Sequence, residues 1–125
     1  VCPLIVETLQ HTVSALSDAE RARLEILMVT LDPDRDTVAV LGEFARGRHI
    51  DSARWTVART DAASTRKLAA LLNVRYRTLA DGDISHSAVL LLLDAQGRIR
   101  ARSERIGSTD PEFLDAIRRV IGEMQ

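Results

Sequence analysis

A continuous apolar run from Glu25 to Leu31 constrains the fold more than any other stretch of the sequence. The run is rich in strand-forming residues, is too short for a buried helix and is ended by Asp32-Pro33. A strand without alternating polar residues is typical of parallel sheets, which are covered on both faces. The run therefore predicts a buried, parallel strand in an α/β layered domain.

Helical patterns lie on both sides of this strand. Pro3 suits the first turn of one helix, and Thr37 and Asp61 are N-cap candidates for two more. Between the second and third helices, residues 55–58 predict another strand. The expected apolar faces of the three helices are, in chain order, Val6, Leu9, Val13 and Leu16; Val38, Leu41, Phe44 and Ala45; and Leu68, Leu71 and Leu72.

The C-terminal part of the sequence predicts a ββα unit. Residues 88–93 form an apolar run, Gln96-Gly97 is a turn signal, and residues 99–106 predict a more polar strand that pairs with the run antiparallel. Asp110 and Pro111 then begin a last helix. The order α-β-α-β-α-β-β-α is that of an α/β domain, and we expect residues 1–125 to form a single domain.

Charge and composition exclude several classes of protein. The formal net charge is -1, and the basic residues are scattered without interleaved aromatic residues, so we expect no nucleic-acid binding. The longest apolar stretch, residues 88–93, is far too short to span a bilayer. Cys2 is the only cysteine, so the chain cannot form an internal disulfide.

Two residues far apart in the sequence are candidates for metal binding. Cys2 precedes Pro3 at the expected start of a helix, where thiolates are favoured, and His86 lies just before an apolar run. A thiolate and an imidazole together suit copper or zinc. Each residue also has a plainer interpretation: a small apolar thiol for Cys2, and a loop histidine with a structural hydrogen bond for His86.

Charged residues follow the first buried strand. Asp32, Arg35 and Asp36 could form a catalytic or metal cluster, but a structural role is favoured. Asp36 lies beside the start of the next helix, and Arg35 is within reach of either carboxylate. We therefore expect these residues to fix the loop. His11 and His49 are expected at the surface, and Trp55 and Tyr76 in packing roles.

Five motifs, in this order, resemble the Sco (SenC) family of copper-binding, thioredoxin-like proteins. The most specific is Asp-Pro-x-Arg-Asp-Thr at the end of a buried strand, supported by the His-Ser that follows later in the chain. The resemblance covers essentially the whole sequence. The motifs are Cys2-Pro3, Thr-Leu-Asp-Pro-Asp-Arg-Asp-Thr at residues 30–37, Val74-x-Tyr76, Ile84-Ser85-His86-Ser87 and Leu93-Asp94-x-x-Gly97.

The resemblance implies a thioredoxin-like sheet with flanking helices and a copper site made of a Cys-x-x-x-Cys pair and a distant histidine. Cys2 corresponds to the second cysteine and His86 to the histidine. The first cysteine would precede Val1. We therefore expect that this chain is truncated at its N-terminus and lacks one or more strands. Ser85 stands where many family members carry Asp, next to the histidine.

The resemblance also implies a function, that of a copper metallochaperone carrying Cu(I) or Cu(II). Its partner would be the copper-bearing subunit of cytochrome c oxidase, for assembly of the binuclear copper site, or another copper chaperone. Family members are typically anchored to a membrane, here the inner membrane facing the bacterial periplasm, by a segment that would lie outside this chain.

Two alternatives remain open. The first is a thiol-disulfide oxidoreductase or peroxide-reducing enzyme, in which Cys2 is catalytic and a thiol reductant is the partner. Prolines occur only at Pro3, Pro33 and Pro111, so the cis-proline that thioredoxins place opposite their active cysteines is absent. His86 occupies the corresponding stretch before the apolar run. A histidine at this position favours metal binding over thiol-disulfide chemistry. The second alternative is an interaction domain whose site no longer functions.

Overall fold

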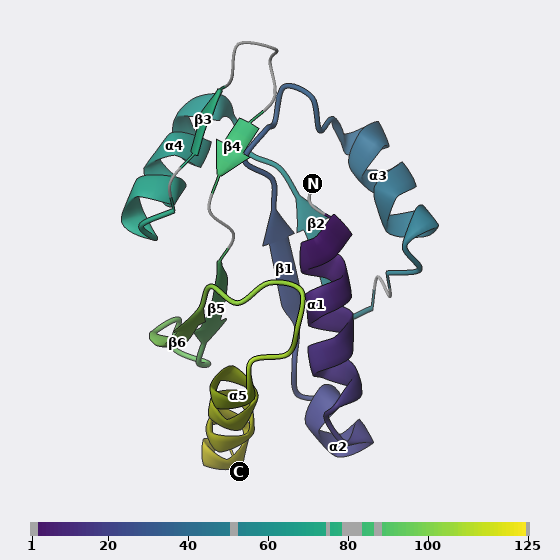
Figure 1. Ribbon diagram of the computed structural model, residues 1–125, viewed down its shortest axis with the longest axis vertical. Coiled ribbons are helices and arrows are strands. Elements are labelled where there is room, and N and C mark those ends of the chain that lie inside the picture. The colour runs from purple at the N-terminus through teal and green to yellow at the C-terminus, as the bar shows by residue number, and fades with distance from the viewer. Residues whose placement is uncertain (1–2, 51–52, 75, 79–83, 87–88, 125) are drawn as a thin grey trace. The chain divides into compact units, whose positions relative to one another are not determined.

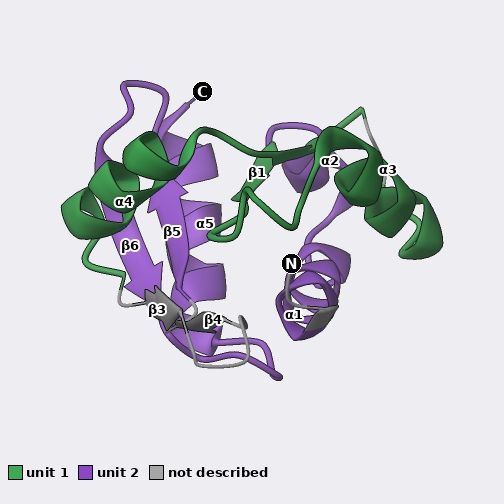
Figure 2. Cartoon of the chain, turned by 90° about the horizontal axis from the view of Figure 1, so that it is seen from above, with its two compact units in different colours: residues 1, 25–87 green, residues 2–24, 88–125 purple. Residues whose placement is uncertain are grey.

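The computed structural model describes residues 3–50, 53–74, 76–78, 84–86 and 89–124. The chain divides into two compact units (Figure 2). Unit 1 comprises Val1 and Glu25–Ser87, and unit 2 comprises Cys2–Leu24 and Ala88–Gln125. No helix in the described ranges has the length and apolar character needed to cross a membrane.

Unit 1 contains the predicted parallel strands. β1 (Ile26–Val29) pairs in parallel with β2 (Trp55–Ala58), with Ile26 opposite Trp55 and Val29 opposite Ala58 (Figure 1). The prediction of a parallel strand is thus confirmed for the centre of the apolar run, but its burial is only partial, because Met28 is buried whereas Leu27 is 66% exposed. The other elements of unit 1 are α3 (Val38–Gly47), α4 (Ala62–Leu71), β3 (Tyr76–Thr78) and β4 (Ile84–His86).

Both predicted N-caps of unit 1 are confirmed. The Thr37 Oγ1 atom accepts a hydrogen bond of 3.3 Å from the Val40 amide at the start of α3. The Asp61 carboxylate accepts one of 2.8 Å from the Ser64 amide at the start of α4. Each cap satisfies a helical N–H group that has no partner within its helix.

Unit 2 contains the predicted ββα unit. β5 (Leu90–Leu93) pairs antiparallel with β6 (Ile99–Ser103), and α5 (Pro111–Glu123) begins at the Asp110 cap. The rest of unit 2 is α1 (Pro3–Ser14) and a short α2 (Asp18–Arg21). Its buried apolar cluster joins α5 to β5 and to the segment after α1; the cluster consists of Leu16, Leu90, Leu92, Phe113, Ala116, Ile117, Val120 and Ile121.

The expected apolar faces of α3 and α4 are partly wrong. Val38 is 75% exposed and Leu71 is 81% exposed. On α4 the buried residues are instead Thr65 and Ala69. The Thr65 hydroxyl donates to the Asp61 carbonyl over 2.9 Å, so it can be buried without losing its hydrogen bond.

A short helix, α2, and a hairpin made of β3 and β4 were not predicted. α2 begins with a capping box in which the Ser17 hydroxyl and the Glu20 carboxylate each bond to the other's backbone amide. The hairpin of β3 and β4 pairs Tyr76 with His86 and Thr78 with Ile84, where no strands were predicted. The segment between the two strands, residues 79–83, lies outside the described residues.

Candidate metal site

The two predicted metal ligands lie in different units. Cys2 directly precedes α1 and lies outside the described residues. His86 is the last residue of β4 in unit 1, where its backbone pairs with Tyr76 of β3. A shared site of Cys2 and His86 therefore stays a prediction. Within the described ranges, no three His, Cys, Asp or Glu residues are grouped so that they could hold a metal ion.

The turn after β1 is organised by the hydroxyl of Thr30. Thr30 Oγ1 donates to Asp36 Oδ2 over 2.5 Å and accepts a hydrogen bond of 3.0 Å from the Asp32 amide. Thr30 is 5% exposed and Asp36 is 8% exposed. A buried carboxylate needs such donors, because its charge is costly to remove from water. These contacts support the structural role expected for Asp36.

A second contact joins this turn to the end of β2. The Arg59 guanidinium donates to the Pro33 carbonyl from Nη2 over 2.8 Å and from Nε over 3.2 Å. The Thr30 amide also donates to the Ala58 carbonyl over 3.1 Å. The loops at the carboxyl ends of parallel strands meet at one edge of a sheet, which is where open α/β sheets bind ligands. Arg59 was not predicted, although its position directly after a predicted strand was a usable signal.

Arg35 lies at the outer side of the same turn. Its Nε atom is 3.7 Å from Asp32 Oδ2, and the Arg35 side chain is 49% exposed. An ion pair with this exposure contributes little to stability because water screens it. The predicted contact between Arg35 and a carboxylate is thus present, but the buried pair of Thr30 and Asp36 does more to fix the turn.

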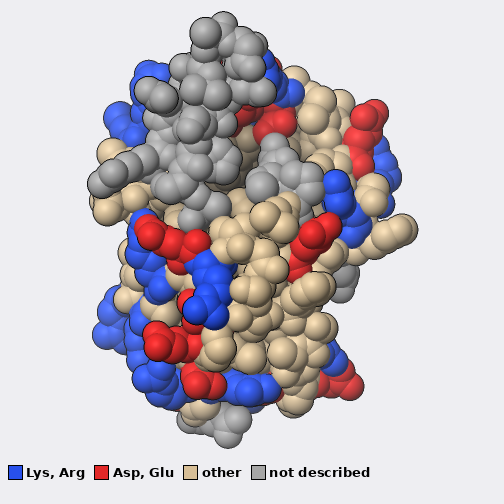
Figure 3. All heavy atoms as spheres, in the orientation of Figure 1, with Lys and Arg blue, Asp and Glu red and all other residues tan. Residues whose placement is uncertain are grey.

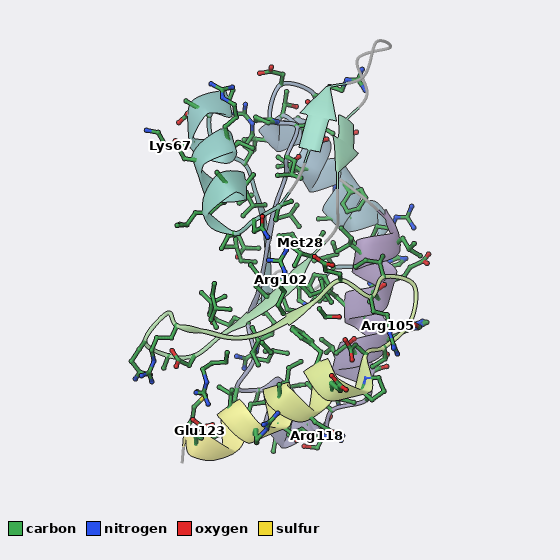
Figure 4. All side chains as sticks on the ribbon, turned by 60° about the vertical axis from the view of Figure 1, so that its left-hand side comes forward. Met28, Lys67, Arg102, Arg105, Arg118 and Glu123 are labelled. Carbon is green, nitrogen blue, oxygen red and sulfur yellow. The ribbon has the colours of Figure 1, made fainter. Side chains whose placement is uncertain are left out.

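Several charged side chains of unit 2 form pairs at its surface. The Arg100 guanidinium holds the Glu123 carboxylate at 2.9 and 2.7 Å, which lowers the pKa of Glu123 and raises that of Arg100. The Nε atom of Arg118 lies 3.3 Å from Oε2 of Glu20. Figure 4 shows Glu123 and Arg118 along α5, and Figure 3 shows acidic and basic side chains interspersed on one face. These pairs belong to the scaffold of unit 2.

Comparison with known proteins settles the family. The model of the SCO1/SenC family matches residues 1–122. The chain belongs to this family. The prediction made from the five motifs is therefore confirmed. Among curated protein sequences, none matches the chain.

Solved structures of Sco/SenC proteins share the fold. A SCO1/SenC family lipoprotein from Bacillus anthracis has a TM-score of 0.81 at 17% identity, covering 96% of this chain and 73% of that one. Copper-bound ScoI from Arabidopsis thaliana has a TM-score of 0.68 at 19% identity, covering 98% of this chain and 76% of that one. Copper-bound ScoI from Bradyrhizobium japonicum has a TM-score of 0.69 at 20% identity, covering 95% of this chain and 78% of that one. The predicted thioredoxin-like α/β fold class is confirmed by these likenesses.

Proposed function

We propose that this SCO1/SenC protein is a copper metallochaperone. The observation that carries the proposal is the family match over residues 1–122, a range that contains Cys2 and His86. Related Sco structures from Arabidopsis thaliana and Bradyrhizobium japonicum contain copper. A thiolate and an imidazole are donors that copper accepts in both oxidation states.

The proposed ligands are Cys2, His86 and a further cysteine that would precede Val1 in a Cys-x-x-x-Cys pair. Cu(I) is a soft ion, and two thiolates with one imidazole hold it well. Cys2 and His86 alone leave the ion short of ligands. The 125 residues by themselves are therefore expected to bind copper weakly.

The bound copper is cargo rather than a permanent cofactor. Transfer proceeds by ligand exchange, in which the donors of the partner replace Cys2 and His86 one at a time. The proposed recipient is the copper-bearing subunit of cytochrome c oxidase or another copper chaperone. The proposed location is the periplasmic face of the bacterial inner membrane, with an anchor outside this chain.

The test is a copper titration on a protein that begins before Val1 and includes the predicted cysteine. We expect about one Cu(I) per chain, as a single three-ligand site requires. Cys2→Ser is expected to abolish tight binding. His86→Ala is expected to weaken Cu(II) more than Cu(I), because imidazole is the harder donor. The matched control is His11→Ala, since His11 is exposed on α1.

Three results would change the assignment. Copper stoichiometry that is the same in Cys2→Ser, His86→Ala and the unsubstituted protein contradicts the proposed ligands. The thiol-disulfide enzyme is favoured instead if a reductase assay shows full turnover in His86→Ala and none in Cys2→Ser. A residue other than cysteine at the upstream motif position would favour an interaction domain without a working site.

A further inference from the structure

We propose that the outward face of α4 lies against an anionic lipid bilayer and sets which surface of the protein meets its membrane. The inference rests on the proposed function, because it names the surface that a protein at the periplasmic face of a membrane presents to the lipids. It concerns unit 1 alone, to which α4 belongs.

α4 carries two stripes of side chains on opposite faces. The inward stripe is buried or half-buried and consists of Thr65, Leu68, Ala69 and the C-cap Leu72. The outward stripe is exposed and consists of Ala63, Arg66, Lys67, Ala70 and Leu71. Both stripes follow the spacing of three and four residues that keeps side chains on one side of a helix. The outward stripe thus combines cations with apolar side chains and contains no acidic residue.

The two cations of the outward stripe have no carboxylate partner in the part of the chain that the structure describes. Arg66 and Lys67 are exposed, and neither forms an ion pair with another described residue. Unit 2 differs, since its Arg100 holds Glu123 over 2.7 Å. Figure 4 shows the Lys67 side chain extending away from the helix. Both charges on α4 are therefore available to an anionic ligand.

The sequence around α4 extends this positive charge. Residues 62–80 contain four basic residues and no acidic residue, in a chain whose formal net charge is -1. The basic residues are Arg66, Lys67, Arg75 and Arg77. The segment therefore attracts an anionic surface although the chain as a whole is slightly negative.

A lipid bilayer fits this face better than a protein partner does. A stable protein interface uses about 20–30 residues from each side and fills pockets with large side chains. The outward stripe of α4 offers five side chains, and its one large apolar residue is Leu71, which is 81% exposed. A bilayer needs no matching pocket, because apolar side chains enter the headgroup region while Lys and Arg extend to the lipid phosphates. A basic helix with an apolar stripe is typical of helices that lie on a membrane surface.

The docking is weak, and the proposed membrane anchor makes it effective. Each cation near an anionic surface strengthens binding by about fivefold, and partial burial of one leucine adds roughly as much. A tethered protein meets the bilayer at a high effective concentration, so weak contacts suffice to orient it. The face of α4 therefore orients the anchored protein rather than recruiting a free one.

The test is co-sedimentation of the 125-residue chain with lipid vesicles, at low salt and high lipid concentration. One set of vesicles contains equal parts of phosphatidylglycerol and phosphatidylcholine, and the other contains phosphatidylcholine alone. We expect binding to the first set only, because the second set carries no net charge. Added salt should weaken the binding, since it screens exposed charges.

Substitutions compare the outward stripe with a matched control. Arg66→Gln with Lys67→Gln removes both cations and should weaken binding by about 25-fold, and Leu71→Gln should weaken it by about fivefold. Glutamine has a helix propensity close to that of the residues replaced, so α4 should persist, which circular dichroism checks. The control is Arg46→Gln with Arg54→Gln, which removes two exposed cations of unit 1 outside α4 and should have a much smaller effect.

The outcomes separate this inference from the proposed function. Absence of binding to the phosphatidylglycerol vesicles, or an equal loss in the α4 pair and the control pair, overturns it. Unchanged binding of Leu71→Gln also overturns it, because charge alone would then carry the attraction and an acidic protein would serve as well. A protein that binds vesicles as expected but no copper loses the proposed function and keeps this surface, whereas one that binds copper but no vesicles shows the reverse.

Discussion

The contacts that stand out within each of the two units are of different kinds. Unit 2 is built around an apolar cluster in which β5, α5 and Leu16 bury their side chains against one another. In unit 1 the best-defined feature is polar, the turn after β1 in which Thr30 bonds to Asp36 and Arg59 bonds to Pro33. Apolar burial is non-directional, whereas a hydrogen bond specifies both distance and angle. Apolar burial therefore stabilises unit 2, whereas in unit 1 directional hydrogen bonds shape the turn that follows β1.

The largest loss of stability is expected when a residue of the apolar cluster of unit 2 is substituted. Phe113 is 6% exposed at the first turns of α5, and Phe113→Ala removes its ring and leaves a cavity. We expect a loss of about 3–5 kcal/mol in the free energy of unfolding. Urea unfolding followed by circular dichroism measures it. Met124→Ala, at a residue 46% exposed near the end of the same helix, should cost less than about 1 kcal/mol. Similar losses in the two variants would mean that the cluster does not stabilise unit 2 as described.

A smaller effect is expected in the polar turn of unit 1. Thr30→Val removes the donor to Asp36 and the acceptor of the Asp32 amide while keeping the shape of the side chain. We expect a loss of about 1.5–3 kcal/mol, the range for hydrogen bonds to charged groups, measured by guanidinium unfolding. The control is Thr56→Val, because Thr56 is exposed on the neighbouring strand β2. A cost no larger than that of the control would show that the turn is not held by Thr30.

Much of the fold could be predicted because its signals are local. The apolar run of β1, the caps Thr37 and Asp61, and the Pro111 start of α5 each lie within a few residues of the structure they specify. α2 was missed although Ser17 and Glu20 have capping-box spacing, since a helix of four residues is too short for apolar periodicity. The exposed Leu71 shows the opposite error, because a leucine at helical spacing need not face the core.

The candidate site was less predictable because its contacts are long-range. Arg59 reaches Pro33 only through the pairing of β1 with β2, and Thr8 meets Gly107 only after α1 packs beside the loop before α5. Neither contact leaves a periodic pattern in the sequence. Cys2 and His86 were identified by chemistry and by family motif, and their meeting in one site remains a prediction. Residue type thus identified the candidate ligands, whereas the long-range contacts of Arg59 and Thr8 were not predicted.

The smallest expected effect is the pH dependence of stability contributed by the helix caps, and it should be similar in the two units. Asp61 caps α4 in unit 1, where the Ser64 amide lowers the pKa of its carboxyl; Asp110 caps α5 in unit 2, where the Ser103 hydroxyl lowers the pKa of its carboxyl. A carboxyl whose pKa is lowered by folding adds stability above its unfolded pKa, and this contribution is lost as pH falls through the folded value. Asp61→Asn and Asp110→Asn keep a good cap but remove the titration.

Both variants should therefore lose less stability than the unsubstituted protein when the pH is lowered from about 6 to about 2, with urea midpoints as the measurement. Asp115→Asn, at an exposed position on α5, controls for loss of a negative charge. Because Asp61 is exposed and Asp110 is only half-buried, the difference between the units should be small. A clearly larger acid effect for Asp110 than for Asp61 would mean that Ser103 and its loop stabilise unit 2 through polar contacts as well as through its apolar cluster.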